Sequence, residues 1–286
     1  MGDITLTAKY YTVKDTDYIG EDGVKRSVSA RVLDGSTKYL TKGWYVVDSS
    51  YTIGKITCLG DVNLIIADDC RCTVGTGSGF DMESGTSLTI FGQDNSNGQL
   101  IAKEDFSVRD FSQYGGSVVS ENNMDCSGKT VISAGSFEVR GDLSGSDALK
   151  ISGGKTKILG SANVPKIQMA WKNISDSVFI GEYPSDAKVS IKEGQMFRSD
   201  EKHFYEGVLT QNEINEISYK TLMPYVAELN GYTLSLDGDI AVNFYMQVHG
   251  DPEELIAKDS YMLFTIGEGD AAQTQKVSLA GAGYDR

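Results

Sequence analysis

Proline and histidine are both scarce in this chain of 286 residues, which has four prolines and two histidines. Because proline removes a backbone donor from a β-ladder, its scarcity suits a fold built mainly from strands. The histidines, His203 and His249, stand in no Gly-His-Gly segment. No Gly-x-Ser-x-Gly elbow joins a strand to a helix either. The sequence therefore indicates neither a histidine-assisted nor a serine-based hydrolase.

Basic residues are also under-represented, with 26 Lys and Arg against 40 Asp and Glu and a formal net charge of −14. Nucleic-acid binding needs a basic footprint, so this balance disfavours it, and it equally disfavours an anionic membrane surface. No run of 18 apolar residues occurs, which predicts no membrane insertion in this segment. The start, Met1 to Thr5, lacks the basic and apolar regions of a signal peptide.

The four cysteines fit no zinc-binding pattern, because the closest two are separated by a single residue. On a strand, that spacing places both side chains on one face. Buried free thiols in a stacked core are the favoured interpretation. A disulfide between neighbouring coils, joining Cys58 to Cys70 or Cys72, is the alternative and would indicate an oxidising compartment. No metal or cofactor is predicted. The cysteines are Cys58, Cys70, Cys72 and Cys126.

Short apolar strand patterns recur at regular intervals through the middle of the chain. From Ile66 to Ile90 is 24 residues, from Ile90 to Ile132 is 42, and from Ile132 to Ile151 is 19. A period near 20 with one or two strands per repeat is typical of stacked coils that pair their edges with the next coil. The fixed Leu/Asn ladder of leucine-rich repeats is missing. The clearest repeat pair aligns residues 132–139 with residues 151–158.

Glycine is abundant, with 32 residues, and glycine-rich segments separate the apolar runs at the expected corners of the coils. These patterns predict an all-β fold, a right-handed parallel β-helix of the pectate-lyase-like type. Residues 43–205 form the predicted helix. The least regular stretch, Asp105–Asn123, is expected to bulge from one coil.

The two ends of the repeat region differ from its middle. Residues 1–42 predict strands, a turn at Gly20–Gly23 and a role in covering the open N-terminal end. Residues 206–225 predict a capping helix from Gln211 to Ser218 and a linker, because Thr210 to Glu213 is a capping box. Residues 226–286 predict the start of a second, β-sandwich-like domain that is truncated, with strands within 231–248, at Tyr261–Ile266 and near residues 275–279.

The segments Gly43–Asp48, Val62–Asp69 and Leu88–Gly92 together resemble the β-helical ectodomains of large surface proteins of gut Firmicutes, which are described as adhesins or carbohydrate-binding proteins. The tail from Asn230 to Met246 resembles the opening of a β-rich module that often follows such helices. The resemblance implies an extracellular, cell-surface or cell-wall-attached protein that is part of a longer multidomain chain.

Exposed aromatic rings are the best sequence signal for glycan binding, because apolar sugar faces stack on them while hydroxyl groups bond to nearby polar groups. Trp44 and Tyr45 also suit a buried anchor in the first coil. With this interpretation the chain is a non-enzymatic stalk or display surface that binds host or dietary glycans, and without an aromatic shelf it is a plain spacer. The candidate ligand-binding residues are Trp171, Tyr114, Tyr183 and Trp44.

The alternative is a polysaccharide lyase or glycoside hydrolase acting on acidic polysaccharide. The nearest match to its chemistry is the pair Asp68 and Asp69 with Arg71, where carboxylates could hold Ca²⁺ beside a basic residue. A polar corner with a surface ion pair explains the same residues. Asp237 and Asp239 could likewise contribute to a Ca²⁺ site, but an Asp-Gly hairpin turn is favoured there.

Overall fold

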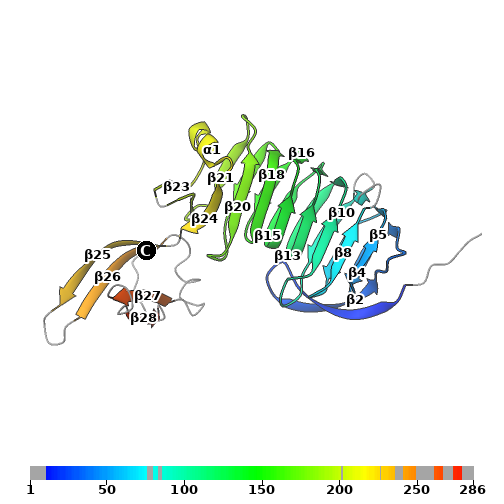
Figure 1. The fold of residues 1–286 in the computed structure, drawn as a ribbon, viewed down its shortest axis with the longest axis horizontal. Coiled ribbons are helices and arrows are strands. Elements are labelled where there is room, and N and C mark those ends of the chain that lie inside the picture. Colours follow the sequence, from blue (N-terminus) through cyan, green and yellow to red (C-terminus); the bar gives the residue numbers. More distant parts are fainter. Residues whose placement is uncertain are drawn as a thin grey trace, which may run out of the picture.

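The computed structural model describes residues 11–75, 80–82, 86–200 and 202–225, together with the backbone of several later strands. It is nearly all β-structure: the coils stack into a β-solenoid of about eight turns, and the described residues include one short helix (Figure 1). The predicted all-β solenoid is therefore confirmed.

A first stack of strands runs the length of the solenoid with parallel pairing from coil to coil. Within it Ile132 pairs with Ile151, and the register predicted from the sequence repeat is confirmed. The stack contains β4 (Gly43–Val47), β7 (Val62–Ile66), β10 (Ser87–Phe91), the first half of β13 (Asp110–Ser120), the first half of β15 (Thr130–Val139), β17 (Ala148–Ile151), β19 (Lys166–Met169) and β21 (Lys188–Ile191).

Two further stacks complete each coil. The second stack contains β5 (Tyr51–Ile53), β8 (Arg71–Val74), β11 (Gln99–Ala102), the second halves of β13 and β15, β18 (Lys155–Asn163) and β20 (Ser177–Glu182). The third stack contains β3 (Tyr39–Leu40), β6 (Ile56–Cys58), β9 (Phe80–Met82), β12 (Phe106–Val108), β14 (Met124–Cys126), β16 (Leu143–Gly145) and the end of β18.

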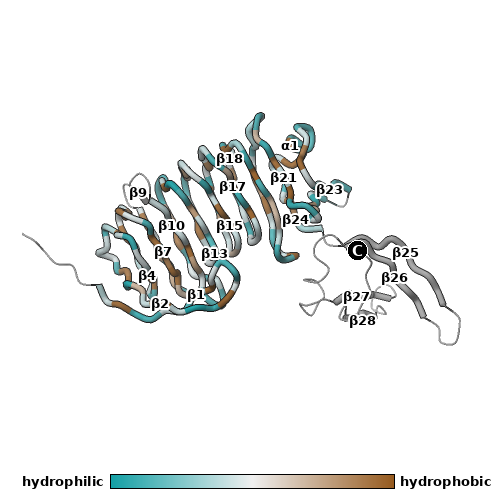
Figure 2. Tube along the Cα trace, turned by 180° about the vertical axis from the view of Figure 1, so that it is seen from behind, coloured by the Kyte–Doolittle hydropathy of each residue, from teal (hydrophilic) through white to brown (hydrophobic). Residues whose placement is uncertain are grey.

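The core is a column of apolar side chains enclosed by the stacks, and Figure 2 shows the apolar positions recurring from coil to coil. Three cysteines are buried in it as free thiols, so the favoured interpretation is confirmed for Cys58, Cys72 and Cys126. Cys70 is also free but only half-buried at a coil corner. Burial raises the pKa of the Cys72 thiol to about 12, which leaves it neutral and unreactive near neutral pH.

The stretch Asp105–Asn123 does not leave its coil as predicted, because it forms β12 and β13 and pairs with both neighbouring coils, and its irregularity is confined to a shift of register against β15 between Gln113 and Ser117. The sequence looks irregular here because of Gln113, which is 0% exposed and occupies the core position between Ile90 and Ile132. A polar residue at that position hides the apolar alternation. Its Nε2 atom donates to the carbonyl oxygens of Gly116 (3.1 Å) and Ser136 (3.0 Å), so the amide group is bonded to the backbone of two coils.

The C-terminal cap contains the predicted helix, α1 (Gln211–Ile217), and its capping box is confirmed. Leu222 and Pro224 differ from the expectation of a helix followed by a linker, because both lie in β24 (Thr221–Tyr225). That strand reverses direction and pairs antiparallel with β20 and with β22 (Met196–Arg198), which also pairs with β23 (Phe204–Tyr205). The reversal ends the parallel stacking.

The N-terminal strands form a hairpin, β1 (Val13–Ile19) and β2 (Lys25–Val32), joined at the predicted turn. Only the end of β2 covers an edge of the solenoid, where Arg31 and Val32 pair with β4. The hairpin packs on the outer face of the first stack, through a second apolar cluster separate from the core (Figures 1 and 2).

Beyond the cap, β25 (Ala227–Ser235) pairs antiparallel with β26 (Ala241–Val248), and β27 (Tyr261–Ile266) pairs antiparallel with β28 (Gln273–Ser278). These strands agree with the sequence patterns. The β-sandwich packing predicted for them stays a prediction, because their side chains lie outside the described residues. Residues 1–10 of the predicted N-terminal strand region, Asp237, Asp239 and His249 also lie outside the described residues.

Candidate functional site

An aromatic cluster fixes the hairpin on the outer face of the first stack. Phe91 lies at its centre, with its ring centroid 5.0 Å from that of Tyr18 on β1, 5.1 Å from Trp44 and 5.6 Å from Tyr114. Val46 and Ile65 pair in register with this row, and both are buried although they point away from the solenoid core. The outer face of the first stack therefore forms a trough, and the hairpin covers the apolar half of this trough.

Polar contacts then set where the hairpin ends. The backbone nitrogen of Ile19 donates to the carbonyl oxygen of Gly92 (3.0 Å), and Nε2 of Gln93 donates to the carbonyl oxygen of Asp17 (2.9 Å). Lys25 forms an ion pair of 2.6 Å with Asp94. These bonds hold the turn at residues 20–23 beside the loop at residues 92–97.

The carboxylates singled out by the sequence brace that same loop from the coil below. Asp68 Oδ2 accepts from the backbone nitrogen of Asn95 (2.9 Å), and Asp69 Oδ1 accepts from the side-chain amide of Asn97 (2.8 Å). Arg71 Nε donates to Gln99 Oε1 (3.0 Å). The geometry therefore gives Asp68 and Asp69 a structural part in shaping the loop.

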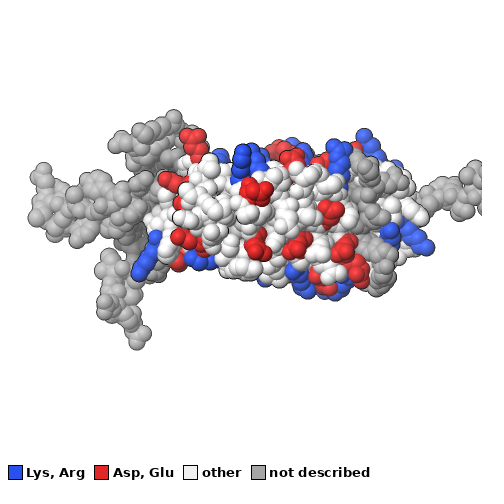
Figure 3. Space-filling model, turned by 90° about the horizontal axis from the view of Figure 1, so that it is seen from above, with Lys and Arg blue, Asp and Glu red and all other residues white. Residues whose placement is uncertain are grey.

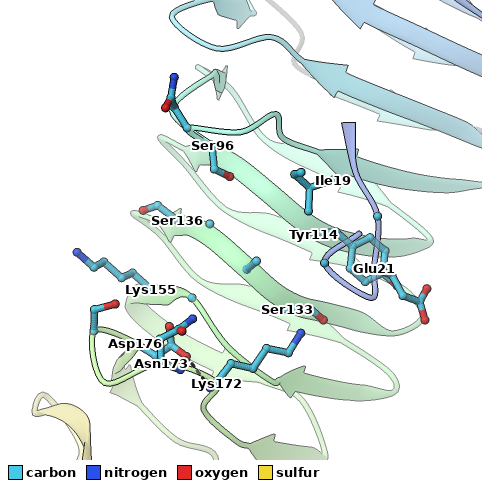
Figure 4. A pocket seen from close by; sticks show the side chains of 17 residues that line it. Ile19, Glu21, Ser96, Tyr114, Ser133, Ser136, Lys155, Lys172, Asn173 and Asp176 are labelled. Carbon is cyan, nitrogen blue, oxygen red and sulfur yellow. Dashed lines mark hydrogen bonds between the residues drawn. The ribbon is translucent and has the colours of Figure 1, made fainter. Parts of the chain in front are cut away.

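Beyond the hairpin turn the trough is open and forms a groove of about 500 Å³ (Figure 4). The turn closes one end, Tyr114 lies beside it on the floor, and a loop at residues 172–176 forms the other end. Backbone and small polar side chains make most of the surface between them. The groove is lined by Ile19, Gly20, Glu21, Gly23, Asn95, Ser96, Tyr114, Ser133, Ala134, Gly135, Ser136, Gly154, Lys155, Lys172, Asn173, Ser175 and Asp176.

A column of glycines keeps this floor free of bulky side chains. Gly116, Gly135 and Gly154 recur every 19 residues at the corner between the first and second stacks, and all have positive φ, of 70°, 82° and 81°. A Cβ on Gly154 would lie 2.7 Å from the carbonyl oxygen of Gly135, and one on Gly135 would collide with that of Gly116. Only glycine satisfies both the backbone angle and the stacking distance.

The far end of the groove is shaped by Asp176 and Trp171. Oδ2 of the buried Asp176 accepts from the backbone nitrogens of Lys172 (2.8 Å) and Asn173 (2.9 Å). The backbone of Trp171 bonds in both directions to the side chain of Gln195, and its indole Nε1 donates to the carbonyl oxygen of Met196 (3.1 Å). Gln195 therefore anchors the start of the loop at residues 172–176, and Asp176 fixes its turn through bonds within the loop.

The predicted ligand-binding residues fall into two groups. Tyr114 lines the groove, and Trp44 is half-buried under the hairpin. Trp171 and Tyr183 are only 6% and 7% exposed, so neither ring offers a face on which a sugar could stack. The prediction that these two rings contact a ligand directly is therefore wrong. Trp171 instead supports the wall of the groove. Burial raises the pKa of the Tyr183 hydroxyl well above its ordinary value. Tyr45 is fully buried, as the anchor interpretation expects.

Tyr183 borders a second hollow, of about 470 Å³, near the C-terminal cap. Its other lining residues are polar or small, and the two contributed by α1, Gln211 and Asn215, bond to each other through their amide groups at 3.0 Å. With Tyr183 almost fully buried, this hollow has no exposed aromatic ring, so the groove beside Tyr114 is the stronger candidate.

The electrostatics of the groove centre on Tyr114 and the charged groups at its ends. Burial raises the pKa of the Tyr114 hydroxyl, and the nearby charge of Glu21 raises it further. Charges elsewhere on the solenoid are interspersed, as Figure 3 shows for one face. In the described part of the chain no group of three or more His, Cys, Asp or Glu side chains is arranged to hold a metal ion. None of the described helices is long and apolar enough to cross a membrane.

The sequence alone did not identify the groove floor or its lysines. A signal was present, because the repeat that aligns residues 132–139 with 151–158 places Gly135 opposite Gly154. Two glycines in register at a coil corner indicate a stretch of bare backbone on the outside of the coil. No protein-family model matches this chain, and neither a curated protein nor a solved structure matches it.

Proposed function

We propose that this chain is a non-enzymatic structural and adhesive module whose groove binds an extended glycan. The observation that carries the proposal is the half-buried ring of Tyr114 on the floor of an open trough of backbone and small hydroxyl side chains. An apolar sugar face can stack on such a ring while its hydroxyl groups bond to serines and backbone groups. The rigid solenoid then serves as the stalk or display surface.

The cellular setting is part of the same proposal. The resemblance to β-helical ectodomains of Firmicutes surface proteins supports an extracellular, cell-surface location within a longer chain, with host or dietary glycans as partners. We also propose that the coils wind right-handed, as parallel strand–connection–strand units do in about 98% of cases. The lyase alternative has less support, because Asp68 and Asp69 are engaged in holding the loop at residues 93–97.

A glycan array with the wild-type chain, Tyr114→Ala and Tyr114→Phe tests the proposal. We expect binding to a defined glycan class that is lost in Tyr114→Ala and retained in Tyr114→Phe, because stacking needs the ring and not the hydroxyl. Tyr219→Ala is the matched control, since Tyr219 is exposed outside the groove. Thermal unfolding of each variant separates lost binding from a loosened hairpin.

Two other results would overturn the proposal. Calcium-dependent cleavage of a uronic-acid polymer would show a lyase instead. Absence of binding to every glycan, with and without calcium, would leave a solenoid that acts only as a spacer.

A further inference from the structure

The groove carries opposite charges at its two ends. Glu21 lies beside Tyr114 at the hairpin end, and Lys155 and Lys172 lie at the opposite end (Figure 4). In Figure 4 the side chain of Lys172 points along the floor toward Ser133. A ligand lying in this groove therefore meets a carboxylate near one end and ammonium groups near the other.

The two lysines are distinguished by their place in the groove. Lys25, Lys103 and Lys157 are each within ion-pair distance of a carboxylate. Among the described residues, no such pair involves Lys155 or Lys172. Several other described lysines, Lys188 among them, also lack such a pair, so what distinguishes Lys155 and Lys172 is that both line one groove.

Asp176 lies in the same loop as Lys172, and its carboxylate is already engaged. Its Oδ2 atom accepts two backbone N–H bonds, from Lys172 and Asn173, and the side chain is buried beneath the loop. Backbone donors satisfy much of its charge, so the ammonium groups keep their capacity to bind an anion from outside.

We propose that this groove selects a glycan that carries an anionic group, a carboxylate or a sulfate, and binds it with that group at Lys172 or at Lys155, whose side chains point to different sides of the groove end. This rests on the proposed glycan-binding function and adds the chemical class of the ligand and its direction. The neighbouring uncharged ring stacks on Tyr114, where Glu21 accepts bonds from hydroxyl groups and repels a second anion. A ligand with its charged and uncharged parts reversed meets the wrong partner at both ends.

The test uses short oligosaccharides in which one uronic acid is linked to uncharged sugars, and the same oligosaccharides after reduction of the carboxyl group to an alcohol, measured by isothermal titration calorimetry on the full chain. Short ligands limit the long-range repulsion from a protein of net charge −14. We expect the acidic form to bind about tenfold or more tightly than the reduced form, from hydrogen bonds to charged groups. A short uncharged oligosaccharide with and without a single sulfate group shows whether sulfate substitutes for carboxylate.

The variants locate the effect. The double variant Lys155→Gln with Lys172→Gln removes the preference for the acidic form, and the corresponding Arg variants retain it. Lys188→Gln is the matched control, because it removes the same charge from an exposed position on β21 outside the groove. Equal binding of the acidic and reduced forms, or an unchanged preference in the double Gln variant, overturns the charge selection.

The outcomes for the two proposals are distinguishable. Equal binding of acidic and reduced forms that is lost in Tyr114→Ala leaves glycan binding intact and rejects only the anionic ligand. A preference for the acidic form that depends on the lysines and is unaffected by Tyr114→Ala rejects the aromatic platform. Absence of binding to any probe rejects both.

Discussion

The trough on the outer face of the solenoid has a covered half and an open half. Both halves are built from the same stacked coils, but one holds the hairpin and the other forms the groove. In the covered half the outward positions are Val46, Ile65 and Phe91, and the chain's own hairpin buries them. In the open half the same row continues through Tyr114 to Ala134, next to the corner glycines Gly135 and Gly154, and nothing in the described residues covers it. Beyond Tyr114 the change from large apolar side chains to small residues thus separates the covered half from the groove.

The comparison also shows how a solenoid can limit a binding site without an added domain. The hairpin turn at residues 20–23 is where the covered half ends and the groove begins. The aromatic cluster holds the hairpin in place, so packing in one half sets the length of the other. Four predictions test this division, in order of decreasing expected effect.

The largest effect is expected from filling the glycine column. Gly135→Ala places a methyl group against the carbonyl oxygen of Gly116 and forces a non-glycine residue into positive φ, so we expect a loss of about 3 kcal/mol or more in the free energy of unfolding. Gly194→Ala is the control, because Gly194 has a φ of 77° but open space around its Cβ position. Urea denaturation of both variants measures the difference. Equal losses would mean that backbone strain, and not coil stacking, requires glycine.

Truncation of the aromatic cluster comes next. Phe91→Ala removes the ring that contacts Tyr18, Trp44 and Tyr114, at a cost of about 3 kcal/mol. Because the ring lies outside the solenoid core, we expect hydrogen exchange to accelerate in β1 and β2 while β17 and β19 stay protected. Uniform acceleration in all four strands would show that the hairpin and the solenoid unfold as one unit.

A smaller effect is expected where the two halves meet. Glu21→Gln removes a charge that helps to raise the pKa of Tyr114, so this pKa should fall but stay above its ordinary value, because burial is the larger cause. A raised tyrosine pKa adds stability below the unfolded-state pKa, which is lost as pH rises through the folded-state pKa. NMR titration of ring-labelled tyrosine, assigned with Tyr114→Phe, measures the shift. An unchanged pKa would mean that the turn does not approach Tyr114 in solution.

The smallest effect is expected at the surface of the hairpin. Lys25→Ala removes an exposed ion pair with Asp94, and such pairs are screened by water and salt. We expect the exchange of β1 amides to change by no more than about twofold, as in the control Lys14→Ala, which removes the exposed pair with Asp48. A much larger change in Lys25→Ala alone would mean that the ion pair, rather than the aromatic cluster, holds the hairpin.

Local patterns in the sequence predicted the elements well. The bounds of β7 and β10 match the apolar runs, and the capping box places the start of α1. What the sequence could not show depends on contacts between distant residues. Trp171 is buried beside a segment 24 residues later in the chain, where Gln195 bonds to its backbone and Met196 to its indole.

Two other failures have the same origin. Gln113 lies in the core because its amide bonds to carbonyl groups of its own coil and of the next one, which no local pattern indicates. The groove itself requires the hairpin to stop at residues 20–23, and its docking depends on partners more than 60 residues away in the chain, such as Gln93. The spacing of the repeats predicts the coils, but it does not predict which distant segment packs on their outer face.

The glycine column has a consequence for how such a protein could change over generations. Each 19-residue coil that contributes a glycine at this corner pairs with its neighbours through the same register. A tandem duplication of one such coil would therefore insert without exposing a new edge, and it would lengthen the bare floor by one strand spacing, about 4.8 Å. The length of the groove can therefore change by one coil at a time, while the hairpin at one end and the loop at residues 172–176 at the other remain unaltered.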